Sequence, residues 1–126
     1  MRVVRWLIAG FIFGALLYTL NASAQEVDTG KGGDIFARRC SGCHSPDINK
    51  EGPRLRGVFG RESASVREFG YSESLKRARL EWNEDTLDRW LANPEAIAPE
   101  TDMSFRLANA EERKAVIAFL KSLGPR

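Results

Sequence analysis

The chain has 126 residues, with 19 Lys and Arg side chains against 17 Asp and Glu, and a formal charge of +2. A chain of this length holds at most one domain around a single modest core. Arg2 and Arg5 supply the excess positive charge, so residues 25–126 are formally neutral and present no long-range basic field for a nucleic acid.

The N-terminal segment predicts an export signal. A basic start is followed by an apolar run over residues 6–20 and by Ala22-Ser-Ala24, a small-x-small cleavage site. The run is shorter than the roughly 20 residues of a usual membrane span. We therefore expect a signal peptide over residues 1–24, cleaved after Ala24, and a periplasmic mature domain over residues 25–126. A retained N-terminal membrane anchor is the alternative.

Four helical segments are predicted in the mature domain, each with a residue that can cap its N-terminus. They are 28–40 (Asp28 or Thr29), 73–79 (Ser72), 83–91 (Asn83) and 109–123 (Asn109). The last has Glu112 three residues after its cap, the spacing of a capping box, and apolar residues at helical spacing from Val116 to Leu123. Gly32 and Gly33 inside the first segment indicate that another element approaches it closely.

The segments between these helices are predicted to be loops. Residues 45–51 are polar, residues 61–70 are charged without a period and expected to be exposed, and residues 94–107 carry two prolines. A loop as long as the last one is usually functional in a small domain. The sequence has no strand-like alternation and no internal repeat, so the predicted fold class is all-α in one domain.

Cys40-Ser-Gly-Cys43-His44 is the stretch in which chemistry dictates residue type and spacing. Cys-x-x-Cys-His is the attachment signal for a c-type haem. The two thiols add to the two vinyl groups of the porphyrin, and the histidine that follows is held under the iron as its proximal ligand. The motif therefore predicts one covalently bound haem c, attached through Cys40 and Cys43 and ligated by His44.

Three other uses of these side chains are weaker. A disulfide between Cys40 and Cys43 would close a very small loop and restrain little entropy of the unfolded chain. A thioredoxin-like redox pair opens a helix in a strand-rich fold, and no strand-helix-strand pattern is visible. Zinc needs four ligands, and two cysteines with the single histidine leave it short of one.

Met103 is the candidate for the sixth iron ligand, because it is the only thioether left once Met1 departs with the signal. A flexible core filler is the usual role of a methionine, and a lysine ligand or an open site are further alternatives. A His/Met pair favours ferrous iron, raises the reduction potential and keeps both oxidation states six-coordinate. A filled sixth position leaves no place for oxygen, peroxide or substrate, which favours a carrier over an enzyme.

The order of motifs resembles a class I cytochrome c of the mitochondrial-like bacterial type, over nearly the whole mature chain. The first helix of that family is similar to Gly32-Gly-Asp-Ile-Phe36, its Gly-Pro turn to Gly52-Pro53, and its methionine loop to Pro99-Glu-Thr-Asp-Met103. Phe119 and Leu120 stand where its last helix meets the first. The resemblance implies a small all-α fold, with about four helices and loops wrapped around one covalently bound haem.

The resemblance also implies the surroundings of the haem. The Pro53 carbonyl is expected to accept a hydrogen bond from the Nδ1–H of His44, which fixes the tautomer of that ligand. The loop between these two residues is a few residues shorter than in the family. Four residues are expected near the haem propionates: Arg61, Tyr71, Trp82 and Thr101. Without the resemblance they are interpreted as a solvated arginine, two core aromatics and a turn residue.

The chain departs from the family pattern around Met103. Glu95, Glu100 and Asp102 occupy a stretch that is commonly lysine-rich, so the electrostatic steering of partners is expected to differ. Glu100 also replaces a turn glycine, which makes the backbone there less permissive. Trp90 stands where a tyrosine often lies, which predicts the loss of a hydroxyl bond to the methionine sulfur.

These features together predict a one-electron carrier that cycles haem iron between Fe(II) and Fe(III), and not an enzyme. The expected partners are redox proteins of a respiratory or photosynthetic chain: a quinol:cytochrome c reductase, a terminal oxidase, a photosynthetic reaction centre or a dehydrogenase. We expect a monomer that docks transiently on membrane complexes. The alternatives are a dedicated cytochrome subunit of one dehydrogenase and a haem peroxidase or sensor with an open sixth site.

Overall fold

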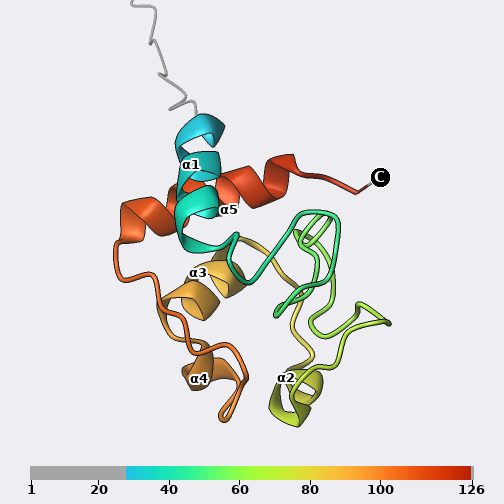
Figure 1. Cartoon of the computed structure of the whole chain (residues 1–126). Coiled ribbons are helices and arrows are strands. Elements are labelled where there is room, and N and C mark those ends of the chain that lie inside the picture. Colours follow the sequence, from blue (N-terminus) through green and yellow to red (C-terminus); the bar gives the residue numbers. More distant parts are fainter. Residues whose placement is uncertain (1–27, 126) are drawn as a thin grey trace, which may run out of the picture.

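The computed structural model describes residues 28–125, which form helices joined by long loops (Figure 1). The helices are α1 (Thr29–Arg39), α2 (Glu73–Ala78), α3 (Glu84–Ala92), α4 (Pro94–Ile97) and α5 (Ala110–Ser122). Apart from one isolated antiparallel bridge between Glu62 and Glu81, these residues form no β-structure, which confirms the predicted all-α class. The predicted signal peptide and its cleavage site lie outside the described residues. Within residues 28–125, no helix has the length and apolar character needed to cross a membrane.

The predicted N-caps are confirmed at the four longer helices. Asp28, Ser72 and Asn109 each accept hydrogen bonds from backbone N–H groups of the helical turn that follows. At α3 the cap is reciprocal, because the Thr86 N–H donates to Asn83 Oδ1 at 3.0 Å and the Asn83 N–H donates to Thr86 Oγ1 at 2.8 Å. A cap of this kind contributes about 1 kcal/mol to helix stability.

Two loop predictions are wrong in part. Helix α4 lies inside the stretch 94–107, where Pro94 suits the first helical turn and the Ala98 N–H closes that turn on the Pro94 carbonyl at 2.9 Å. A single turn is too short to give a hydrophobic period, so sequence reasoning missed it. The stretch 61–70 is not simply exposed, because Val66 is buried among charged neighbours that hide it from any pattern.

Helices α1 and α5 cross at close range (Figure 1). A β-carbon at Gly32 would lie only 2.8 Å from the Cβ of Phe119, so the glycine is needed for the two backbones to approach. The rings of Phe36 and Phe119 meet beside it, with centroids 5.3 Å apart. Ile35 and Val116 are buried in the same interface, and each such side chain contributes about 2 kcal/mol when it leaves water. The predicted close approach to the first helix is confirmed.

The rest of the core is built by α3 and by the segments that carry the predicted haem ligands. Trp82, before α3, and Trp90, within it, pack edge to face with ring centroids 5.3 Å apart. Leu107, at the end of the loop that leads into α5, is 2% exposed. The Cys40–His44 turn begins where α1 ends, and the loop that carries Met103 leaves α4 and returns past α3 to α5 (Figure 1).

Candidate haem site

The Cys-x-x-Cys-His segment forms a compact turn at the end of α1. The His44 N–H donates to the Cys40 carbonyl at 2.8 Å, and the Cys43 N–H donates to the same oxygen at 3.1 Å. The two thiols are not joined by a disulfide. Burial raises the pKa of the Cys40 thiol to about 11, the opposite of the lowered pKa that a reactive redox thiol requires. The raised pKa of Cys40 thus argues against the redox-pair interpretation.

His44 has one ring nitrogen engaged and the other left as an acceptor. Its Nδ1 lies 2.9 Å from the Pro53 carbonyl oxygen, and a carbonyl can only accept, so Nδ1 carries the proton. Burial lowers the pKa of His44, which favours the neutral ring. The hydrogen bond expected from the family resemblance is therefore present. A neutral imidazole with Nδ1–H engaged offers Nε2 to a metal ion.

Gly52 has no side chain, which lets the loop over residues 45–53 pass directly against the ring of His44. A β-carbon there would lie 2.7 Å from both ring nitrogens of His44, so any larger residue would displace the ring. The Gly52 N–H donates to the Cys43 carbonyl at 2.8 Å, and the Lys50 N–H donates to the Gly52 carbonyl at 2.9 Å. The side chain of Lys50 donates to the Ser41 carbonyl. The short loop is thus closed on the turn that carries the histidine.

Met103 is half-buried against the core and accepts a hydrogen bond. The indole Nε1–H of Trp90 donates to the Met103 sulfur at 3.1 Å. As the sequence predicts, no tyrosine hydroxyl reaches this sulfur, but the indole N–H takes its place as a donor. Sequence reasoning considered only the lost hydroxyl. The available signal was that a buried tryptophan needs an acceptor for its N–H.

The loop around Met103 is held by the helices on either side of it. The Leu107 N–H donates to the Leu91 carbonyl of α3 at 2.8 Å. Arg113 of α5 donates to the Leu107 carbonyl at 3.0 Å and to Asp88 of α3 at 2.6 Å, a clamp that the sequence did not reveal. Glu100 stands at the turn where the family has a glycine. Its φ of 61° is left-handed, which is the backbone conformation that a glycine adopts readily.

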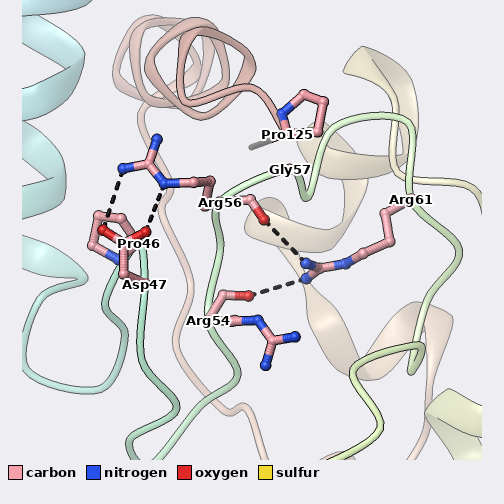
Figure 2. Close-up of a pocket in the computed structure, with 7 residues that line it drawn as sticks. All are labelled: Pro46, Asp47, Arg54, Arg56, Gly57, Arg61 and Pro125. Carbon is pink, nitrogen blue, oxygen red and sulfur yellow. Dashed lines mark hydrogen bonds and ion pairs between the residues drawn. The ribbon is translucent and has the colours of Figure 1, made fainter.

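Arg61 carries a guanidinium with an unused donor. Its terminal nitrogens donate to the carbonyls of Arg56 and Arg54 at 3.3 and 3.1 Å, and Figure 2 shows the group turned toward them. Its Nε is buried without a hydrogen-bond partner. Burial lowers the pKa of Arg61, because a charged group is costly to desolvate. A buried cation with a free N–H is suited to an anionic group such as a haem propionate.

The structure brings some of the other expected propionate neighbours to Arg61. The backbone N–H of Trp82 donates to the Arg61 carbonyl at 2.9 Å, and the Trp82 side chain is buried. The Tyr71 hydroxyl accepts from the Val66 N–H at 3.4 Å, which leaves its own proton available, and burial raises the pKa of Tyr71. Thr101 is half-buried and belongs instead to the methionine loop.

A surface pocket of about 330 Å³ lies beside Arg61 (Figure 2). It is lined by Pro46, Asp47, Arg54, Arg56, Gly57, Arg61 and Pro125. Arg56 donates to Asp47 at 2.6 Å and to the Leu123 carbonyl at 2.8 Å, and Arg54 donates to Glu68 at 3.1 Å. Arg54 and Arg56 are therefore already engaged within the chain, and Arg61 is the arginine of this pocket that keeps an unused N–H.

The donor set fits a haem. It combines two thiols at attachment spacing, an imidazole with a fixed tautomer, a thioether, and a buried guanidinium with an unused N–H. Held in an all-α fold of this size, it defines the class of small electron carriers with one covalently bound haem.

Comparison with known proteins gives the family. The Cytochrome c family profile matches residues 30–124. Cytochrome c of Gibberella zeae is 41% identical over 98 residues, which cover 75% of this chain and 92% of the relative. Cytochrome c of Stellaria longipes is also 41% identical, over 101 residues that cover 77% and 94% of the two chains. Among solved structures, cytochrome cH from Methylobacterium extorquens is 33% identical, with a TM-score of 0.71 and coverage of 75% of this chain and 98% of that one.

The chain therefore belongs to the cytochrome c family, as a class I cytochrome c. It carries one covalently bound haem c and functions as an electron-transfer protein, not as an enzyme.

Proposed function

We propose that Cys40 and Cys43 attach the haem and that His44 and Met103 ligate its iron from opposite sides. The observation that carries this assignment is the 2.9 Å hydrogen bond from His44 Nδ1–H to the Pro53 carbonyl, because it dedicates Nε2 to a ligand. The bound haem supplies a one-electron Fe(II)/Fe(III) couple. His44 and Met103 would hold the iron in both oxidation states, so the protein would have little to reorganise during electron transfer.

Arg61, Tyr71 and Trp82 are proposed to hold the haem propionates, and Thr101 to approach them from the methionine loop. The support is the buried Nε–H of Arg61, which has no protein acceptor, and the hydroxyl proton of Tyr71, which its bond to Val66 leaves available. Hydrogen bonds from these donors would replace much of the hydration that a propionate loses on burial.

We further propose that residues 1–24 form a signal peptide cleaved after Ala24, and that the mature domain, residues 25–126, shuttles electrons in the periplasm. Its partners there would be membrane complexes of a respiratory or photosynthetic chain. The support is the sequence of the N-terminal segment. The first residue of the protein recovered from the periplasmic fraction should be Gln25; recovery of intact chain from the membrane fraction would favour an anchor.

A dedicated subunit of one dehydrogenase is the second candidate function. Glu95, Glu100 and Asp102 are all exposed around Met103, and Glu95 forms an ion pair with Arg106 at 2.9 Å. Such a surface steers toward a basic partner and away from an acidic one. Electron-transfer rates that fall with salt for a single dehydrogenase, and not for general oxidases, would favour the dedicated subunit.

The ligand assignment is tested with holoprotein and carbon monoxide. The ferrous wild type should not bind carbon monoxide promptly at neutral pH, whereas Met103→Ala should bind it and show a lower midpoint potential. Prompt binding by the wild type would contradict the closed carrier. An unchanged spectrum of Met103→Ala would show that Met103 is not a ligand.

A further inference from the structure

Trp90 makes a polar contact that its sequence position does not predict, because an indole stands where the family often has a tyrosine hydroxyl. It lies on the inner side of α3, 7% exposed, and its Nε1–H points at the Met103 sulfur at 3.1 Å. A tryptophan needed only to fill the core would not require this orientation. The question is therefore what the N–H does for the thioether.

The donor and the acceptor are both held in place by the fold. Trp90 sits on a helix whose start is fixed by a reciprocal cap, and its ring packs at 64° against Trp82. The loop of Met103 is tied to the same helix, because the Leu107 N–H donates to the Leu91 carbonyl at 2.8 Å. The packing of Trp90 on α3 and the attachment of the methionine loop to the same helix thus bring the indole N–H to the sulfur.

An indole differs from a hydroxyl in what it can do at this position. The indole N–H is a donor only, whereas a tyrosine hydroxyl can rotate and also accept. A thioether sulfur has two lone pairs, so one can bind iron while the other accepts from Trp90. With iron bound to the sulfur, the positive end of the N–H dipole would lie close to the metal and would disfavour the extra charge of ferric iron.

We propose that Trp90 is a positioning residue for Met103 that fixes the direction of the sulfur lone pair and raises the reduction potential. The proposal rests on Met103 being an axial ligand, as proposed above. It explains how the chain keeps a donor to the sulfur without the tyrosine hydroxyl. The donor has one fixed direction in both oxidation states, so the hydrogen bond does not have to rearrange when the electron moves.

The test compares Trp90→Phe with Trp90→Tyr in the holoprotein. The two variants have nearly the same volume and differ by one hydroxyl. Trp90→Phe should lower the midpoint potential and weaken the sulfur-to-iron charge-transfer band of the ferric protein, and Trp90→Tyr should recover part of both. Equal potentials for wild type and Trp90→Phe would overturn the proposal, as would equal shifts in the two variants, because loss of packing would then explain the effect.

A second measurement leaves Trp90 itself unchanged. In the ferrous wild type, the Nε1–H of Trp90 should exchange with deuterated solvent slowly, and Met103→Leu should accelerate that exchange while leaving the Trp82 indole unchanged. Rapid exchange in the wild type, or no effect of Met103→Leu, would overturn the proposal. The outcome is distinguishable from failure of the ligand assignment: if the spectrum of Met103→Leu equals that of the wild type, Met103 is not the ligand at all.

Discussion

The two sides of the candidate haem site are built differently. On the proximal side, His44 is held by its own neighbours in sequence, through the Cys40 carbonyl at 2.8 Å and the Pro53 carbonyl at 2.9 Å. On the distal side, Met103 is held by a residue of another element, the indole of Trp90 at 3.1 Å. His44, the proposed proximal ligand, is thus positioned by local backbone, and Met103, the proposed distal ligand, by tertiary packing.

This difference has a consequence for stability. Bonds within a short segment persist while that segment keeps its shape, whereas bonds between α3, α5 and a loop are lost as soon as these elements separate. The distal loop also carries an unfavourable backbone conformation at Glu100, with φ of 61°. We therefore expect the distal side to open first, and the proximal side to tolerate the least change in shape.

The largest effect is expected from Gly52→Ala on the proximal side. The new β-carbon would overlap the His44 ring, so the ring or the loop must move, at a cost of about 3 kcal/mol in the free energy of unfolding. Urea titration of the holoprotein measures this cost. Gly42→Ala is the matched control, because a β-carbon at Gly42 meets nothing within 4 Å. Equal stability of the two variants would show that the proximal loop is not tightly packed on the histidine.

An intermediate effect is expected from Arg113→Lys on the distal side. Arg113 joins Asp88 to the Leu107 carbonyl, and a lysine ammonium cannot reproduce that fork. The Arg113 side chain is only 13% exposed, so the loss of these hydrogen bonds should cost about 2 kcal/mol in the free energy of unfolding.

The control for this substitution lies on α3, the helix that carries Asp88. Arg89→Lys changes the ion pair with Asp85, whose side chains are 58% and 75% exposed, and should cost less than about 0.5 kcal/mol. If both lysine variants were equally stable, the clamp between α3, α5 and the distal loop would not contribute to stability.

The difference between the two sides also explains what sequence reasoning could predict. The proximal site follows from spacing alone, because Cys40, Cys43 and His44 lie within five residues and Gly52-Pro53 ends nine residues after His44. The helix caps were predictable for the same reason, since each cap bonds to its own first turn. Local chemistry can be read directly from a local pattern.

The distal contacts could not be predicted in that way. Trp90 and Met103 are thirteen residues apart, and Arg113 reaches Asp88 across twenty-five, so both contacts depend on how α3, α5 and the loop pack. The sequence singles out Met103 only by elimination, as the remaining thioether, and it predicts the lost hydroxyl bond without predicting the indole donor that replaces it. Glu100 is the exception, because a missing turn glycine is visible in the sequence and its left-handed backbone follows from it.

The smallest effect is expected from Glu100→Gly, which should stabilise the distal loop. A glycine adopts a left-handed backbone without the steric cost that a β-carbon brings, and the net gain should be about 1 kcal/mol after its larger unfolded-state entropy is subtracted. Thermal unfolding of the holoprotein measures the gain. Glu100→Ala removes the same carboxylate but keeps the β-carbon, so it should show no gain. Equal stabilisation by both variants would assign the effect to charge instead of backbone strain.

Urea titration of the ferric holoprotein tests the central claim most directly, with two signals followed together. The sulfur-to-iron charge-transfer band reports the distal ligand, and the far-ultraviolet circular dichroism reports the helices. We predict that the band disappears at a lower urea concentration than the helices unfold, and that Glu100→Gly moves the first transition upward. Coincident transitions, or loss of the helices before the band, would contradict the account of a weaker distal side.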